Sequence, residues 1–163
     1  MQIVFHNNLM VEAEVADTFE AKTMGLMFRN NLDKHAGMLF VYNQSPAAIW
    51  MKNTYIPLDI LFCRATFDGG QVVKIAHGEP LSEETILCDN NIDYVIELNK
   101  GYCDENKIGV GDYFTISCVS DITQKLNKMA DILEVNGFFE EAESVDELCK
   151  NKKIGSRKLL CGL

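Results

Sequence analysis

Several polar residues with chemical potential interrupt segments of the chain that are otherwise apolar. In AAIWMKNT (47–54), Trp50 is followed closely by Lys52 and Asn53. A lysine and an asparagine in an apolar strand need ionic or hydrogen-bonding partners wherever they are buried. Three further residues could supply such partners, because they interrupt other apolar segments in the same way: Arg29, Asp59 and Glu97.

We expect these polar residues to converge in one pocket, walled by Trp50 and Met38. The expected members of the cluster are Arg29, Trp50, Lys52, Asn53, Asp59 and Glu97. Cationic groups beside carboxylates and an aromatic ring could hold a small polar or anionic ligand. The same residues could instead form an internal ion-pair network that fixes strand register. Replacing Lys52 by Met separates the two interpretations: lost binding indicates a ligand site, whereas a large loss of stability indicates a network.

The sequence offers little for catalysis. Asp59 and Glu97 could act as the acid and base of a glycosidase, but a domain of this length can hardly build the long cleft that such an enzyme needs. The histidines lie outside the polar segments and are expected to be exposed or to cap elements: His6, His35 and His77. The sequence contains no phosphate-binding glycine loop and no evident pair of nucleophile and base. We therefore assign no catalytic residues.

The cysteines and methionines are expected to be structural. The chain has six cysteines, none of them in a Cys-x-x-Cys pair. Several lie in apolar runs such as LDILFC and FTISC, where a reduced cysteine behaves as a small hydrophobic residue. A group of methionines is more typical of an adaptable core than of a metal or haem site: Met24, Met27, Met38 and Met51. The sequence therefore predicts no metal and no cofactor.

The overall charge argues against two classes of partner. The formal net charge is −9, whereas nucleic-acid-binding proteins concentrate Lys and Arg on one face. Anionic lipid surfaces repel an acidic protein, and no apolar run approaches the roughly 20 residues that a membrane span requires. The opening residues MQIVFHNN lack the basic and apolar regions of a secretory signal. We expect a cytoplasmic protein without nucleic-acid or membrane partners.

Apolar segments separated by turn residues predict a mainly β domain of the α+β class over residues 1–119. The expected strands are 2–5, 10–16, 37–42, 47–54, 58–65, 72–78, 84–88, 94–99 and 113–119. Residues 18–28 have helical spacing, with Asp17 or Thr18 as the cap. So many short strands imply a small antiparallel barrel or a sandwich-like domain with one or two short helices.

A change of pattern after this domain predicts an αα-hairpin and a basic tail over residues 120–163. Two apolar stripes at helical spacing flank Gly137, which follows Asn136 and is a typical helix stop. A hairpin of this size buries too little apolar surface to be stable alone. We therefore expect it to dock on the β domain, on a second copy of the chain or on a partner.

Six segments between Val11 and Asp112 resemble the DUF192 family in both order and spacing. They are GLMFR (25–29), GMLF (37–40), WMKNT (50–54), PLDILF (57–62), VIELN (95–99) and KIGVGD (107–112). The resemblance implies a small, mainly β domain with one or two helices, in a family of uncharacterised function. The hairpin lies outside the resemblance. Its sequence ADILEVNGFFEEAESVDEL is similar to hairpins appended to some phage and environmental bacterial proteins.

Three classes of function remain open. The first is a non-catalytic binding module for an unknown small polar ligand or protein partner, with the hairpin docking it to itself or to that partner. The second is a structural or assembly protein, located in the virion if it is phage-encoded, in which the polar cluster only stabilises the fold. An enzyme of unknown reaction is the third and least favoured, because no reactive set of residues is evident.

Overall fold

The computed structural model describes residues 1–117 of the 163-residue chain. Within this range the compact unit is Met1–Ile116. The predicted hairpin and the predicted boundary at residue 119 lie outside the described residues. No helix among the described residues is long and apolar enough to cross a membrane.

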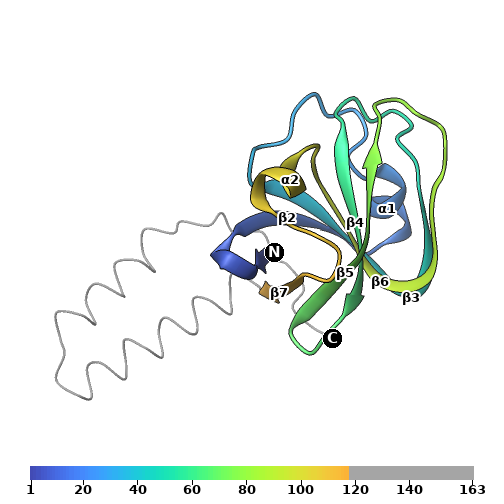
Figure 1. Cartoon of the computed structure of the whole chain (residues 1–163). Helices are drawn as coiled ribbons and strands as arrows, with labels where there is room; N and C mark the ends of the chain where they lie inside the picture. Colours follow the sequence, from blue (N-terminus) through green and yellow to red (C-terminus); the bar gives the residue numbers. More distant parts are fainter. Residues whose placement is uncertain (118–163) are drawn as a thin grey trace, which may run out of the picture. The chain divides into compact units, whose positions relative to one another are not determined.

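The described part of the chain is mainly β, as predicted. Its strands are β1 (Gln2–Phe5), β2 (Met10–Ala16), β3 (Ala36–Ile49), β4 (Leu58–Ala65), β5 (Gly69–Gly78), β6 (Ile86–Asn99) and β7 (Tyr113–Ser117). They follow one another in the order β1-β2-β3-β6-β4-β5-β7, which is that of a closed barrel. The helices are short: α1 (Phe19–Met24), α2 (Tyr102–Asn106) and the 3-10 turn η1 (His6–Asn8). Figure 1 shows the long strands β3 and β6 side by side.

The predicted antiparallel arrangement does not hold at one strand pair. β2 and β3 run parallel, from Glu12 opposite Ala36 to Ala16 opposite Phe40. Parallel neighbours need a crossover connection, and the segment that contains α1 supplies it. The other pairs in the described sheet are antiparallel.

Two predicted strand boundaries also differ from the structure. The strands predicted at 37–42 and 94–99 extend into the single long strands β3 and β6, whose register shifts between Val41 and Ala47. Asn43 and Gln44 have positive φ values of 53° and 60° there. Such irregularities bend a strand without ending it, so each long strand absorbs two predicted ones.

The sheet separates two apolar cores, and β4 is buried on both faces. Leu58, Ile60 and Phe62 belong to one core, with Phe40 and Val95, which we call the α1-side core. Leu61 and Cys63 belong to the other, with Ile96, Leu98 and Tyr102, which we call the α2-side core. Alternate side chains of a strand point to opposite faces. Neighbouring residues of β4 and β6 therefore enter different cores.

The short helix α1 begins and ends at identifiable residues. Thr18 caps it, since its hydroxyl accepts a hydrogen bond from the Ala21 N–H at 3.1 Å. Gly25 ends it with a φ of +46°, a conformation that L side chains rarely adopt. A Cβ atom at Gly25 would also lie 3.3 Å from the Phe40 ring. The chain can therefore turn closely over β3 at this point.

Candidate functional site

Glu97 occupies a buried position on β6, within the sheet. Its directly opposed neighbours are Met38 on β3 and Ile60 on β4. Directly opposed residues share a face of the sheet, so the carboxyl group emerges among apolar side chains of the α1-side core. Only 5% of Glu97 is exposed. A carboxyl group in such surroundings loses most of its hydration, which disfavours its charged form.

A small hollow, which we call the Glu97 pocket, opens beside this carboxyl group. It is lined by Lys22, Thr23, Met24, Gly25, Leu26, Met27, Phe40, Tyr42, Ala48, Ile49, Trp50, Thr54 and Glu97. Its volume is about 60 Å³. A water-sized probe occupies roughly 10–15 Å³, so the hollow accommodates a chemical group of only a few non-hydrogen atoms.

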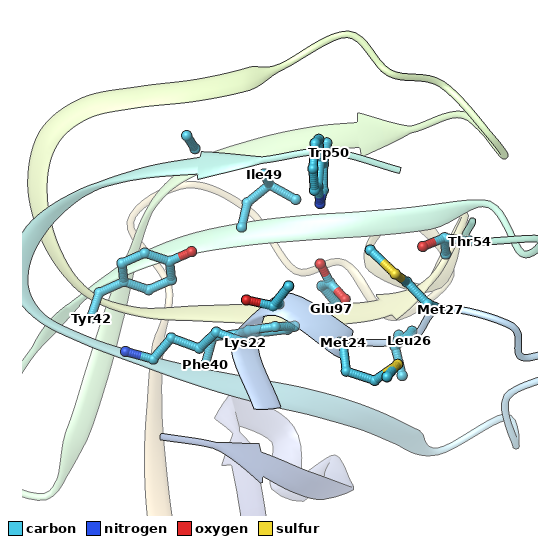
Figure 2. Close-up of a pocket in the computed structure, with 13 residues that line it drawn as sticks. Lys22, Met24, Leu26, Met27, Phe40, Tyr42, Ile49, Trp50, Thr54 and Glu97 are labelled. Carbon is cyan, nitrogen blue, oxygen red and sulfur yellow. The ribbon is translucent and has the colours of Figure 1, made fainter. Parts of the chain in front are cut away.

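Aromatic and polar side chains surround the Glu97 carboxyl group in different ways (Figure 2). The ring nitrogen of Trp50 lies on the side of the ring that faces Glu97, and the Tyr42 hydroxyl points into the pocket. The Lys22 ammonium points away from Glu97. It lies 5.2 Å from the centroid of the Tyr42 ring, at cation–π distance.

Burial governs the electrostatics of the Glu97 pocket. It raises the pKa of Glu97 from an ordinary 4.5 to about 8. Burial also raises the pKa of Tyr42 above its ordinary value, and the nearby Glu97 charge contributes to that shift. At neutral pH the pocket therefore presents a protonated carboxyl group and a neutral phenol.

The Glu97 carboxyl group has no hydrogen-bond or ion-pair partner within residues 1–117. Its only described charge interaction is with the Tyr42 phenol. Buried polar groups in native proteins nearly always have a partner, and an exception calls for an explanation such as an absent ligand or a water molecule. Within residues 1–117, the side-chain polar atom that is fully buried without a partner is Gln2 Oε1. The unpartnered Glu97 carboxyl group is instead open to the hollow that it lines.

The segment that carries Trp50, predicted as a strand, is a turn. The Thr54 N–H donates to the Met51 carbonyl at 3.0 Å, and the Met51 N–H donates to the Ser82 carbonyl at 3.0 Å. Asn53 has a φ of +56°, which breaks strand alternation. Ile49 and Met51 are buried and Trp50 is 46% exposed, so the alternation of β3 continues to Met51 and ends in the turn.

Lys52 and Asn53 lie in this turn, at the edge of the site. The Lys52 ammonium is 5.4 Å from the centroid of the Trp50 ring and 3.9 Å from a Glu83 carboxylate oxygen. Both Lys52 and Glu83 are well exposed at their charged ends. Neither Lys52 nor Asn53 lines the Glu97 pocket.

Asp59 lies on the opposite face of the sheet from Glu97. It is opposed by Leu98 on β6 and by His77 on β5, and therefore faces the α2-side core. One carboxylate oxygen lies 2.9 Å from His77 Nδ1, and the other accepts the Cys103 N–H at 2.9 Å. Asp59 is fully buried yet satisfied, so it fixes β5 and the start of α2 to the sheet.

Arg29 is also occupied elsewhere. Its guanidinium group forms a two-fold hydrogen bond with the Glu14 carboxylate, at 2.5 and 2.7 Å. Glu14 belongs to β2, so the pair ties the segment after α1 to that strand. The Arg29–Glu14 pair therefore has a structural role, and neither residue lines the Glu97 pocket.

The expectation of one convergent polar cluster is therefore not met. Of the six expected residues, only Trp50 and Glu97 line the same pocket. The separation has a simple cause, because the β4–β6 register places Asp59 and Glu97 on different faces. Met38, expected as a wall, is the cross-strand neighbour of Glu97.

Sequence reasoning missed several residues of the pocket, although a signal for them was present. Tyr42 and Phe40 lie on β3, and their role depends on strand pairing that the sequence does not reveal. Four residues of the segment predicted as a helix over 18–28 line the pocket, two of them in α1 and two after it: Lys22, Thr23, Leu26 and Met27. The signal was the amphipathic spacing itself, which predicted a helix face without saying what it covers.

The described cysteines and acidic residues give little for redox or metal chemistry. Cys63, Cys88 and Cys103 are buried and free. Burial raises the pKa of the Cys63 and Cys103 thiols, and the charge of Asp59 adds to the shift at Cys103. A thiol in this state is a poor nucleophile. Within residues 1–117, no group of three His, Cys, Asp or Glu side chains could hold a metal ion.

Comparison with other proteins places the domain among uncharacterised relatives. The model of the family described as DUF192, Uncharacterized ACR, matches residues 2–116. The crystal structure of a putative transcription regulator from Sinorhizobium meliloti 1021 is 32% identical, with a TM-score of 0.62, and the match covers 69% of this chain and 88% of that chain. A protein of unknown function from Novosphingobium aromaticivorans is 31% identical, with a TM-score of 0.63 and coverage of 71% and 82%. No curated protein matches the chain.

Proposed function

The chain belongs to the DUF192 family, described only as uncharacterised, and we propose that its domain is a non-catalytic binding module that holds a small polar group in the Glu97 pocket. The observation that carries this proposal is a buried carboxyl group, without a partner among the described residues, beside a hollow of about 60 Å³. Burying an unsatisfied polar group costs free energy. A ligand with complementary groups recovers that cost on binding.

A binding role fits the lining better than a catalytic one. The pocket contains one carboxyl group, one phenol, one lysine and one indole N–H among otherwise apolar or hydroxyl-bearing residues. Nucleophilic catalysis needs a nucleophile held against a base, whereas the hydroxyl groups of Thr23 and Thr54 donate to the backbone carbonyls of Phe19 and Lys52. A pocket with a few placed polar groups in an apolar wall is typical of ligand recognition.

One structural relative suggests a setting for such binding. The Sinorhizobium protein is described as a putative transcription regulator, and by analogy this domain could sense an effector molecule. The net charge of −9 gives no support for direct contact with nucleic acid. The predicted C-terminal hairpin would then dock the domain on a second copy or on a protein partner.

The chain offers a site-specific reporter for testing this proposal. Trp50 is the only tryptophan of the sequence, and it lines the pocket. In ¹H–¹⁵N spectra of the full chain, its indole signal should shift in a saturable way with n-butylammonium, butyrate or butyramide. Glu97→Gln should abolish or invert that response. Lys52→Met is the matched control and should retain it, because Lys52 does not line the pocket.

If none of the three compounds shifts the Trp50 signal, the binding function is wrong. The stability of the Lys52→Met variant is a second control. The Lys52 side chain is exposed, and its ammonium group lies 3.9 Å from a Glu83 carboxylate oxygen. Its replacement by Met should cost less than about 1 kcal/mol, as for other surface ion pairs. A loss of several kcal/mol would instead support the internal network.

A structural or assembly role is the second candidate, and exposed apolar side chains favour it. Phe28, Tyr55 and Leu81 are 55%, 44% and 57% exposed. Phe28 and Leu81 have φ values of +63° and +62°, which are unusual for bulky residues. Backbone hydrogen bonds link their loops to the 50–54 turn, from Phe28 N–H to the Asn53 carbonyl and from Leu81 N–H to the Thr54 carbonyl.

Light scattering on the full chain tests the assembly role. If these side chains mediate self-association, the double variant Phe28→Ser, Leu81→Ser should reduce the measured mass to that of a monomer. If the native chain is already a monomer, self-assembly through this surface is excluded. The binding proposal does not depend on the outcome, because neither residue lines the Glu97 pocket.

A further inference from the structure

We propose that the group recognised by the Glu97 pocket is a primary organic ammonium ion on a short alkyl chain. This inference rests on the binding function proposed above and names the class of ligand. It follows from four features of the pocket: the missing hydrogen-bond donors, the aromatic wall, the volume and the placement of neighbouring charges.

The first feature is a shortage of donors at the Glu97 carboxyl group. A carboxylate accepts hydrogen bonds at two oxygens, yet it receives none within the described part of the chain. A primary ammonium group carries three N–H donors and the opposite charge, and hydrogen bonds between ionised partners are the strong ones. It therefore satisfies the carboxylate and neutralises its charge in one contact.

The second feature is the aromatic and thioether wall. Trp50, Tyr42 and Phe40 line the pocket together with Met24 and Met27. The faces of aromatic rings attract cations, Trp most strongly. The molecule already uses this interaction at the rim, where the Lys22 ammonium lies 5.2 Å from the Tyr42 centroid and the Lys52 ammonium lies 5.4 Å from the Trp50 centroid.

The third feature is size. A hollow of about 60 Å³ holds only a few non-hydrogen atoms at roughly 10–15 Å³ for each water-sized probe. An ammonium group with a short alkyl stem fits this limit. A nucleotide or a sugar ring does not. The apolar side chains of Leu26 and Ile49 in the lining suit the methylene groups of such a stem.

The fourth feature is the placement of the charged and titratable groups around the Glu97 pocket. They are Lys22 on α1 and Tyr42 on β3, with Lys52 beyond the Trp50 ring. The Lys22 ammonium points away from Glu97 (Figure 2), and it makes no ion pair with that residue in the part of the chain described. No internal cation among the described residues therefore occupies the position that the ligand would take.

The pH dependence of binding separates this inference from its main rival. An ammonium ion binds the ionised carboxylate, so it must displace the Glu97 proton below the pKa of about 8. Its affinity should rise about tenfold from pH 7 to pH 9, by linkage to that titration. A ligand that accepts a hydrogen bond from protonated Glu97 should instead bind about tenfold more weakly at pH 9 than at pH 7.

The experiment titrates the full chain with n-butylammonium, tetramethylammonium, butyrate and butyramide at pH 7 and pH 9, following the Trp50 indole signal. We expect n-butylammonium to bind at least tenfold more tightly than the other three at pH 9. Tetramethylammonium is the control for a purely aromatic site, because it has the charge but no N–H donor. Glu97→Gln should reduce n-butylammonium affinity at least tenfold.

A second variant tests the inference without changing Glu97. Lys22→Gln removes a positive charge at the pocket and should strengthen n-butylammonium binding about two- to threefold, because like charges repel at this range. The same variant should weaken binding of butyrate. A comparison of n-butylammonium with Nα-acetyl-lysine amide then shows whether a free amine or a lysine side chain fits better, and either result supports the inference.

Two outcomes overturn the inference in different ways. If butyrate or butyramide shifts the Trp50 signal in a Glu97-dependent way and binds more tightly at pH 7, the ligand class is wrong and the binding function survives. If no compound shifts the signal, both the ligand class and the binding function are wrong. Equal affinity for tetramethylammonium and n-butylammonium also overturns the inference, since it removes the role of the N–H donors.

Discussion

Asp59 and Glu97 are two buried carboxyl groups on adjacent strands, and their surroundings are opposite. Asp59 has two hydrogen-bonding contacts at 2.9 Å, with His77 and with the Cys103 N–H. Glu97 has no such partner within residues 1–117, and its pKa is raised to about 8 by burial. The β4–β6 register places them on opposite faces of one sheet.

The difference shows how scaffolding can be told from a candidate site when both are polar and buried. A satisfied carboxylate connects elements and so helps to specify the structure. A carboxyl group without a partner lowers the stability of the fold. Of the two, only Glu97 lines the Glu97 pocket. A ligand bound there could therefore offset the free-energy cost of its unpartnered carboxyl group.

The largest expected effect is the pH dependence of stability at Glu97. The folded carboxyl has a pKa of about 8 and the unfolded one about 4.5. The contribution of Glu97 to the free energy of unfolding is therefore fully present below pH 4.5 and is lost as the pH rises to 8, because the carboxyl group of the unfolded state releases its proton first. Glu97→Gln should remove this slope and raise the free energy of unfolding at pH 7 by on the order of 3 kcal/mol.

Urea denaturation of both proteins between pH 4 and pH 9 measures this effect. The expected result is that the two unfolding free energies converge at the acid end and separate as the pH rises. A variant less stable than the native chain at every pH would show that Glu97 stabilises the fold as Asp59 does. The contrast between the two carboxyl groups would then be lost.

Asp59→Ala should have the next largest effect, in the opposite direction. It leaves the buried Cys103 N–H without an acceptor and removes the contact with His77. We expect a loss of about 2 kcal/mol in the free energy of unfolding, the usual cost of a buried unsatisfied donor. His77→Ala is the matched control and should cost less, since His77 is largely exposed. Equal costs for the two variants would place the main contribution in the ion pair.

These two residues also show how far the sequence predicts the structure. Apolar alternation and turn residues were sufficient to predict most strands. The 18–28 pattern predicted a helix where α1 lies, but α1 ends at Met24 and the rest of the predicted span follows it as a turn. The faces of Asp59 and Glu97 depend on the register between β4 and β6, a long-range pairing that local patterns do not contain. The strand predicted at 50–54 was wrong for another reason. The left-handed conformation of Asn53 and the hydrogen bond from the Met51 N–H to the Ser82 carbonyl override the strand-like composition of this segment.

Trp50 should affect binding more than stability. Trp50 is 46% exposed, and Trp50→Leu keeps an apolar side chain over the part that is buried. The affinity for n-butylammonium should fall about three- to tenfold through loss of the cation–π contact. The methyl signals of Met24 and Met27, which also line the pocket, can report binding in this variant. An unchanged affinity would exclude the aromatic wall from recognition.

Arg29→Gln should have the smallest effect. The Arg29–Glu14 pair is partly exposed, and surface ion pairs contribute about 0–1 kcal/mol. We therefore expect thermal unfolding to change little and the response of the Trp50 signal to stay as in the native chain. A loss of ligand binding in this variant would show that Arg29 takes part in the site, although it does not line the Glu97 pocket.

The titration of Glu97 itself tests the central claim most directly. The side-chain carboxyl carbon of Glu97, assigned with the help of Glu97→Gln, can be followed by ¹³C NMR between pH 4 and pH 10 in the full chain without ligand. We predict a midpoint near pH 8, as expected for a buried carboxyl group that lacks a partner. A midpoint near its ordinary value of 4.5 would mean that solvent or another residue already satisfies the group, and would contradict the account.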